Sequence, residues 1–192
     1  MAVLGHPWRH SWLRSSGGWL CALMVLLASH SPGQTPNVEY RIKAAYLFNF
    51  AKFVSWPSQT FAQTNSPIVI GILGKDPFGA ELDQTVAGKK IEQHPLQVKR
   101  LNDSDPLSGC QILFIADSEH RRVAQLLENA RRLPILTVGE MDDFTEAGGM
   151  IRFLKHDNTI RFEIDLAPVQ RAGLKISSKV LQVAIVKGKA EK

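Results

Sequence analysis

The segment Gly71–Asp76 has residue types that could cradle a phosphate, because two glycines and a lysine follow a run of apolar residues. Its spacing matches neither the P-loop, which also needs a serine or threonine, nor the GxGxxG pattern of dinucleotide-binding proteins. Asp76 would also place a carboxylate at the start of the next helix, where a bound anion would lie. The segment therefore does not predict a nucleotide site.

Histidines and acidic residues are the next candidates for chemistry. His94, His120 and His156 lie in three separate segments, without an HExxH or CxxC pairing, which predicts isolated surface residues. The acidic residues at 140–143 suit the start of a helix, and those at 163–165 are expected to alternate towards solvent in a hairpin. Neither group forms a catalytic pair, and no metal site or cofactor is predicted.

Serine and cysteine offer no better nucleophile. Ser177, Ser178 and Lys179 lack the S-x-x-K spacing of serine–lysine enzymes, and helix capping explains the serines. Cys110 is the only cysteine left once the leader described below is removed, so no disulfide can form within the mature chain. It opens the apolar run 112–116, which indicates a buried small hydrophobe. The sequence therefore predicts no catalytic residue.

An unusually apolar helix is predicted at the start of the mature chain, over Tyr40–Ser55. The segment has no glycine or proline, and its apolar residues recur at helical spacing around most of the circumference. We expect it to lie across a sheet and beneath neighbouring helices, or to present one flank to a partner chain.

Strands and helices then alternate, which predicts an α/β fold. The fold expected is a mostly parallel twisted sheet with helices on both faces and an antiparallel C-terminal hairpin at the edge. Asp76 and Ser118 are expected to cap helices. The predicted strands are 67–74, 95–101, 110–116, 134–138, 149–154 and 159–165, and the later helices are 76–86, 118–132, 141–147, 168–172 and 177–183.

The first residues read as a secretory leader. Arg9 and Arg14 precede an apolar run at Trp19–Ala28, which is too short to span a bilayer because a span needs about 20 residues. Small residues follow, so residues 1–33 are predicted to be a signal peptide that is cleaved between positions 28 and 33.

One domain is expected at residues 38–187, followed by a basic tail at 188–192. The roughly 158 mature residues can bury about 68 to 70% of the unfolded chain's surface, which suits a single core. Loss of residues 1–33 removes two arginines and no acid, so the net charge falls by two from +5. No basic stripe remains that would indicate a nucleic-acid partner.

A set of short motifs, in order and at ordinary spacing behind the leader, resembles the YfiR family of secreted bacterial regulators from about Val38 to Val186. The motifs are Ala44–Leu47, Asn49, Phe50, Lys52, Phe53, Trp56, Pro57, Asp76–Gly79, Ala87–Lys89, Cys110–Ile115, Ser118, Glu119, Leu136–Gly139, Gly148–Ile151 and Ala172–Lys179.

The resemblance implies a non-enzymatic inhibitor in the periplasm. Members of that family contact the periplasmic sensor domain of an inner-membrane diguanylate cyclase, which lowers cyclic di-GMP and biofilm formation. Some members carry disulfides that couple redox state to activity, and with Cys110 as its single mature cysteine this chain departs from them.

Our leading hypothesis places the binding surface on the first helix and the turn near its end. This surface would bind the membrane partner, and a second copy of the chain is another candidate partner. The competing interpretation is that the same apolar residues complete the core. The candidate residues are Tyr46, Asn49, Phe50, Lys52, Phe53, Trp56, Gly173, Lys175, Ser177, Ser178 and Lys179.

The alternative function is a sensor for a small ligand. A pocket would then lie beyond the carboxyl ends of the strands, which is where open α/β sheets bind ligands. Its candidate boundary residues are Asp76, Phe78, Gly79 and Gly139.

Overall fold

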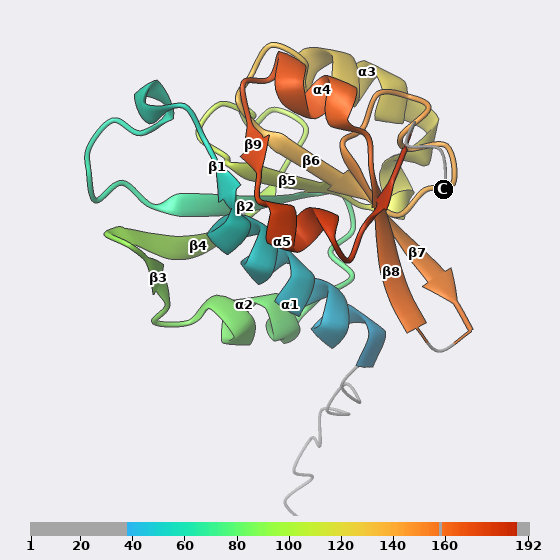
Figure 1. Ribbon diagram of the computed structural model, residues 1–192, viewed down its shortest axis with the longest axis horizontal. Coiled ribbons are helices and arrows are strands. Elements are labelled where there is room, and N and C mark those ends of the chain that lie inside the picture. The colour runs from blue at the N-terminus through green and yellow to red at the C-terminus, as the bar shows by residue number, and fades with distance from the viewer. Residues whose placement is uncertain (1–37, 158, 188–192) are drawn as a thin grey trace, which may run out of the picture. The chain divides into compact units, whose positions relative to one another are not determined.

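The computed structural model describes residues 38–157 and 159–187, which alternate between strands and helices (Figure 1). The helices are α1 (Val38–Phe53), α2 (Ala80–Val86), α3 (Val123–Ala130), α4 (Leu166–Arg171) and α5 (Ser178–Leu181), with short 3-10 segments η1 (Ser58–Thr60) and η2 (Asp117–Arg122). The strands are β1 (Val54–Ser55), β2 (Ile68–Leu73), β3 (Lys90–Ile91), β4 (His94–Leu101), β5 (Ile112–Ile115), β6 (Leu136–Gly139), β7 (Ile151–His156), β8 (Thr159–Ile164), β9 (Lys175–Ile176) and β10 (Ile185–Val186).

One sheet runs through the domain, in the order β10-β8-β7-β6-β5-β2-β4-β3. Strands β4, β2, β5, β6 and β7 pair in parallel, as does β10 with β8. The antiparallel pairs are the β7–β8 hairpin and the short β3–β4 turn. The predicted α/β fold, with a mostly parallel sheet and antiparallel strands towards the edge, is confirmed.

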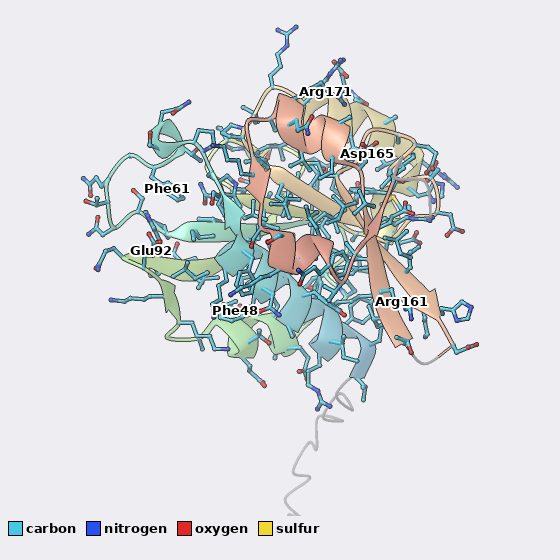
Figure 2. The ribbon with its side chains drawn as sticks, viewed as in Figure 1. Phe48, Phe61, Glu92, Arg161, Asp165 and Arg171 are labelled. Atoms are coloured by element: carbon cyan, nitrogen blue, oxygen red, sulfur yellow. The ribbon has the colours of Figure 1, made fainter. Side chains whose placement is uncertain are left out.

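Helices cover both faces of the sheet, and side chains fill the space between sheet and helices (Figure 2). Successive side chains of each central strand point to opposite faces, so each strand contributes to both layers of the core. In β5, Ile112 and Phe114 join the core cluster that includes Leu47 of α1, whereas Leu113 packs with Leu127 of α3 on the other face. The strands buried on both faces were recognisable in the sequence as continuous apolar runs.

The first helix matches its prediction closely and stops two residues early. It covers Val38–Phe53, and the next two residues form β1, which pairs antiparallel with β9 in a separate two-stranded sheet. Neither β1 nor β9 was predicted. This pairing matters for function because it ties the end of α1 to the segment after α4.

The predicted start of α2 was wrong. The Asp76 Oδ1 accepts a hydrogen bond from the Phe78 N–H at 2.7 Å, so this side chain closes a turn instead of capping the helix. The helix begins after Gly79, whose φ is +55°. A glycine is well suited to this left-handed backbone conformation.

Three other helix predictions also need correction. Ser118 lies within η2 and its Oγ accepts from the Lys75 N–H at 2.9 Å, so it caps no helix. Residues 141–147 form successive turns in place of a helix. The last helix, α5, ends at Leu181 because the chain then turns into β10. Its predicted cap is present, since the Ser177 Oγ accepts from the Lys179 N–H.

Candidate functional site

The β1–β9 pairing brings the two halves of the predicted binding surface together. Ser55 lies opposite Lys175 and Val54 opposite Ile176, and the Ser177 N–H donates to the Phe53 carbonyl at 2.9 Å. We call the side chains gathered here the junction patch, which consists of Lys52, Phe53, Ser55, Lys175, Ser177, Ser178 and Lys179.

Phe53 lies at the centre of the junction patch. Its half-buried ring has the Lys52 Nζ at 5.3 Å and the Lys179 Nζ at 5.7 Å from its centroid. Both distances fall within the range of a cation–π contact. Lys52, Lys175 and Lys179 are exposed, so the patch presents positive charge around an aromatic surface.

The turn after α4 reaches this surface because Gly173 has a φ of +71° and ends the helix. A Cβ at Gly173 would lie 3.3 Å from the Pro57 Cγ, so the chain after β1 passes close beside it. Helix α4 therefore ends within one residue of position 172, the end predicted from the sequence.

Three of the candidate aromatic residues serve the core. Phe50 is 1% exposed and packs edge-on against Phe162. The half-buried Tyr46 donates from its hydroxyl to the Ile160 carbonyl at 3.3 Å. The Trp56 Nε1–H donates to the Gln111 carbonyl at 3.1 Å, which anchors the chain after β1 to the sheet. Of the first-helix candidates, Asn49 and Lys52 are exposed and Phe53 is partly so.

The second group of candidates, Asp76 to Gly79, is held by Arg100 of β4. Arg100 contacts Asp76 at 3.0 Å, the Gly79 carbonyl at 2.9 Å and Asp83 at 2.5 Å. The guanidinium lowers the pKa of the Asp83 carboxyl, and the two carboxylates raise the pKa of Arg100. Phe78 is buried against Phe114, with ring centroids 4.8 Å apart.

Gly139, at the end of β6, is covered by its own chain. A Cβ there would come within 2.4 Å of the fully buried Phe144 ring. The ring thus fills the space beside Gly139, and a pocket bounded by Gly139 and Asp76–Gly79 stays a prediction.

A hollow of about 440 Å³ does lie beyond the carboxyl ends of β5 and β6, with other residues around it. We call it the carboxyl-edge hollow. Its lining is Glu39, Tyr40, Lys43, Asp117, Glu140, Asp142, Phe153, Leu154 and Lys155.

A buried lysine forms the floor of this hollow. The Lys43 residue is 3% exposed, and its Nζ lies 2.6 Å from Glu39 and 2.5 Å from Glu140. The same ammonium sits 4.5 Å from the centroid of the Tyr40 ring. Tyr40 in turn donates to Glu140 at 3.1 Å, so α1 is tied to the loop after β6.

The charges in the hollow shift two ionisation equilibria. Burial and the neighbouring Glu140 carboxylate raise the pKa of Tyr40 above its ordinary value, which keeps its hydroxyl protonated. Burial also acts to raise the pKa of Glu39, but hydrogen bonds from Lys155 and Lys43 outweigh it and leave that pKa lowered.

Sequence reasoning missed Lys43, although a signal for it exists. Glu39 and Lys43 stand four residues apart on one helix, which is the spacing of a stabilising pair. The partner Glu140 comes from a segment 97 positions away, which periodicity alone does not reveal.

The described residues contain no group of three or more histidine, cysteine, aspartate or glutamate side chains arranged to hold a metal ion. No helix in residues 38–157 and 159–187 has the length and apolar character that crossing a membrane requires.

The comparison with known protein families matches most of the chain. A family model described as YfiR/HmsC-like matches residues 40–185. The matched segment runs from the first turn of α1 to β10. It includes the junction patch and every lining residue of the carboxyl-edge hollow except Glu39. The chain therefore belongs to the YfiR/HmsC-like family.

Proposed function

We propose that this protein is a non-enzymatic periplasmic regulator that inhibits an inner-membrane diguanylate cyclase. It would bind the periplasmic sensor domain of that cyclase and so lower cyclic di-GMP and biofilm formation. The observation that carries the proposal is the family match over residues 40–185.

The predicted leader constrains the mechanism. A signal peptide at residues 1–33 would send the chain out of the cytoplasm, where cyclic di-GMP is made. A protein in the periplasm can change that pool only through a partner that crosses the membrane. Inhibition by direct contact with the cyclase's outer domain meets this requirement.

The junction patch is the surface that we assign to the partner. Its exposed side chains come from two segments more than 100 positions apart, which are joined by the two-stranded sheet of β1 and β9. Val54 and Ile176 of this sheet pack into the main core, so the sheet is anchored there. The buried Phe50 and the hydrogen bond from Trp56 to the Gln111 carbonyl fix the neighbouring backbone to the core. Recognition would then rest on Asn49, Lys52, Phe53, Lys175, Ser177, Ser178 and Lys179.

Deletion of the gene tests the function directly. Cellular cyclic di-GMP should rise in the deletion strain and return to its original level when the full chain is supplied. The matched control is the chain without residues 1–33, which stays in the cytoplasm and should not restore the level. Unchanged cyclic di-GMP after deletion would contradict the proposal.

A small-ligand sensor is the second candidate, and the carboxyl-edge hollow favours it. The hollow lies where open α/β sheets bind ligands, and it offers Tyr40, Phe153 and several charged groups. A thermal-shift screen of periplasmic metabolites checks this, since a ligand at about 100 times its Kd stabilises the fold by about 2.7 kcal/mol. If no metabolite stabilises the protein while cyclase binding is intact, the protein acts as a binding partner of the cyclase without a ligand.

A further inference from the structure

Two long segments of this chain contain no carboxylate. Residues 40–75 and residues 166–187 hold lysines and arginines but not one aspartate or glutamate. The pairing of β1 with β9 places these segments directly beside each other. The junction patch therefore forms where two segments meet whose charged side chains are all positive.

The lysines of the junction patch differ from several other cations of the domain in that they have no carboxylate beside them among the described residues. Lys43, Arg100 and Arg152 each contact at least one carboxylate. Within residues 38–157 and 159–187, by contrast, Lys52, Lys175 and Lys179 form no ion pair. The ammonium groups of Lys52 and Lys179 lie 5.3 and 5.7 Å from the centroid of the Phe53 ring.

Positive charge without internal partners favours an external anion, because complementary charge steers association and fixes orientation. We infer that the junction patch binds an acidic segment of the partner protein, with carboxylates on either side of Phe53. This inference rests on the proposed function, since it names the chemistry by which the cyclase's periplasmic domain would be recognised.

A protein segment fits the patch better than an anionic lipid surface does. Lipid-binding basic clusters use about four to eight cations, whereas the junction patch has three. Among the described residues, the large apolar side chains exposed to solvent are Val38, Ile42, Val183 and Ile185, and none of them belongs to the patch. A membrane-inserting anchor is therefore missing from this surface.

The two best positions for a test are Lys175 and Lys179, because reversal of their charge should not weaken the fold. Lys175 is exposed in β9. Lys179 stands in the first turn of α5, where a negative charge suits the helix dipole better than a positive one. The variant K175E/K179E has its matched control in K90E/K99E, which makes the same change at two exposed lysines of β3 and β4.

The first experiment uses defined probes on the isotope-labelled mature chain. A hexa-glutamate peptide should shift the amide resonances of Phe53 and residues 175–179, and a hexa-glutamine peptide should not. The shifts should be lost in K175E/K179E and kept in K90E/K99E. Shifts at other positions, or equal shifts with both peptides, would overturn the inference. So would binding to phosphatidylglycerol vesicles that the same substitution abolishes, since that result assigns the patch to lipid.

The second experiment uses the full chain and the cyclase that co-purifies with it. K175E/K179E should weaken the complex at least about tenfold, K175R/K179R should keep it, and added salt should weaken the wild-type complex. An unchanged affinity for K175E/K179E overturns the acidic-segment inference and leaves the proposed function standing. Failure of any cyclase to co-purify with the wild type counts against the function, and the peptide titration then decides the inference by itself.

Discussion

Lys43 is the residue whose removal should reveal most about the carboxyl-edge hollow. Its ammonium neutralises Glu39 and Glu140, whose side chains are only 21% and 13% exposed. The Lys43→Met change keeps most of the length of the side chain and removes the ammonium from both carboxylates. We expect a loss of about 2 to 3 kcal/mol in the free energy of unfolding, below the usual cost of breaking a buried pair because the carboxylates keep some hydration. Urea titration measures the loss.

Lys155→Met is the matched control for that change. Lys155 also contacts Glu39, at 2.7 Å, but its side chain is 60% exposed. An exposed pair contributes less than about 1 kcal/mol, so this variant should lose much less stability. Equal losses in the two variants would show that burial of the Lys43 ammonium has no special importance.

Glu39 should make the stability of the fold depend on acidity. Hydrogen bonds from Lys155 and Lys43 outweigh the effect of burial, so the pKa of Glu39 is lower in the folded chain than its ordinary 4.5. A lowered pKa adds stability above pH 4.5, and that stability is lost as the pH falls through the folded value.

Comparison of the wild type with Glu39→Gln tests this sign. The wild type should be the more stable protein at neutral pH, and the difference should shrink as the pH falls from about 7 to about 3. Urea unfolding at a series of pH values measures it. A difference that stays constant, or that grows with acid, would contradict the assignment of the shift to ion pairing.

At the scale of elements, the packing of one aromatic ring explains why the segment after β6 forms turns where a helix was predicted. The Phe144 ring packs so closely that a Cβ at Gly139 would lie 2.4 Å from it and a Cβ at Gly149 would lie 2.2 Å from it. These two glycines let residues 141–147 fold as turns against the end of the strand. Asp142 and Asp143, which suggested the start of a helix, are exposed and impose no periodicity, whereas Glu140 pairs with the buried Lys43.

Gly139→Ala should therefore destabilise the domain by about 1 to 3 kcal/mol, as overpacking of a filled core does. The double variant Gly139→Ala/Phe144→Leu provides the control. A smaller side chain at 144 makes room for the new methyl group, so the two losses should add up to more than the double variant shows. Strict additivity, measured by thermal unfolding, would mean that the two positions do not touch.

The elements that could be predicted are those whose burial leaves a pattern in the sequence. Helix α1 shows helical spacing of its apolar residues, and β2, β5 and β6 are continuous apolar runs because helices cover both of their faces. Strands β1, β9 and β10 have two residues each, which is too short for any periodicity. The Asp76–Pro77 pair suggested the start of a helix but belongs to a turn, since Arg100 and the Phe78 N–H bind the Asp76 carboxylate.

The candidate site was only partly predictable, because contacts between distant segments leave no periodic pattern in the sequence. The end of α1 and residues 173–179 were both singled out, and the structure places them in contact through β1 and β9. Which of their side chains face solvent depends on packing between distant segments: Phe50 lies inside and Phe53 is half exposed. The Lys43 cluster likewise needs α1, the loop after β6 and β7 to meet before it exists.

At the scale of the whole molecule, Cys110 can report whether the domain opens. It is 4% exposed, and burial raises the pKa of its thiol, so little reactive thiolate is available in the folded state. Its packing is tight, because a Cβ at Gly71 would lie 2.8 Å from the Cys110 Sγ. Reaction with a thiol reagent should therefore require unfolding of the surrounding core.

We expect Ellman's reagent to label the folded mature chain at least about a thousandfold more slowly than the chain in urea, as a stability of about 5 kcal/mol implies. Residues 34–192 contain one thiol, which cannot form a disulfide within one chain, so dithiothreitol should leave their Tm and their affinity for the proposed cyclase partner unchanged. Rapid labelling of the folded protein, or a reductant-sensitive dimer on a non-reducing gel, would contradict this. A dimer of that kind would point to redox control through an intermolecular disulfide at Cys110.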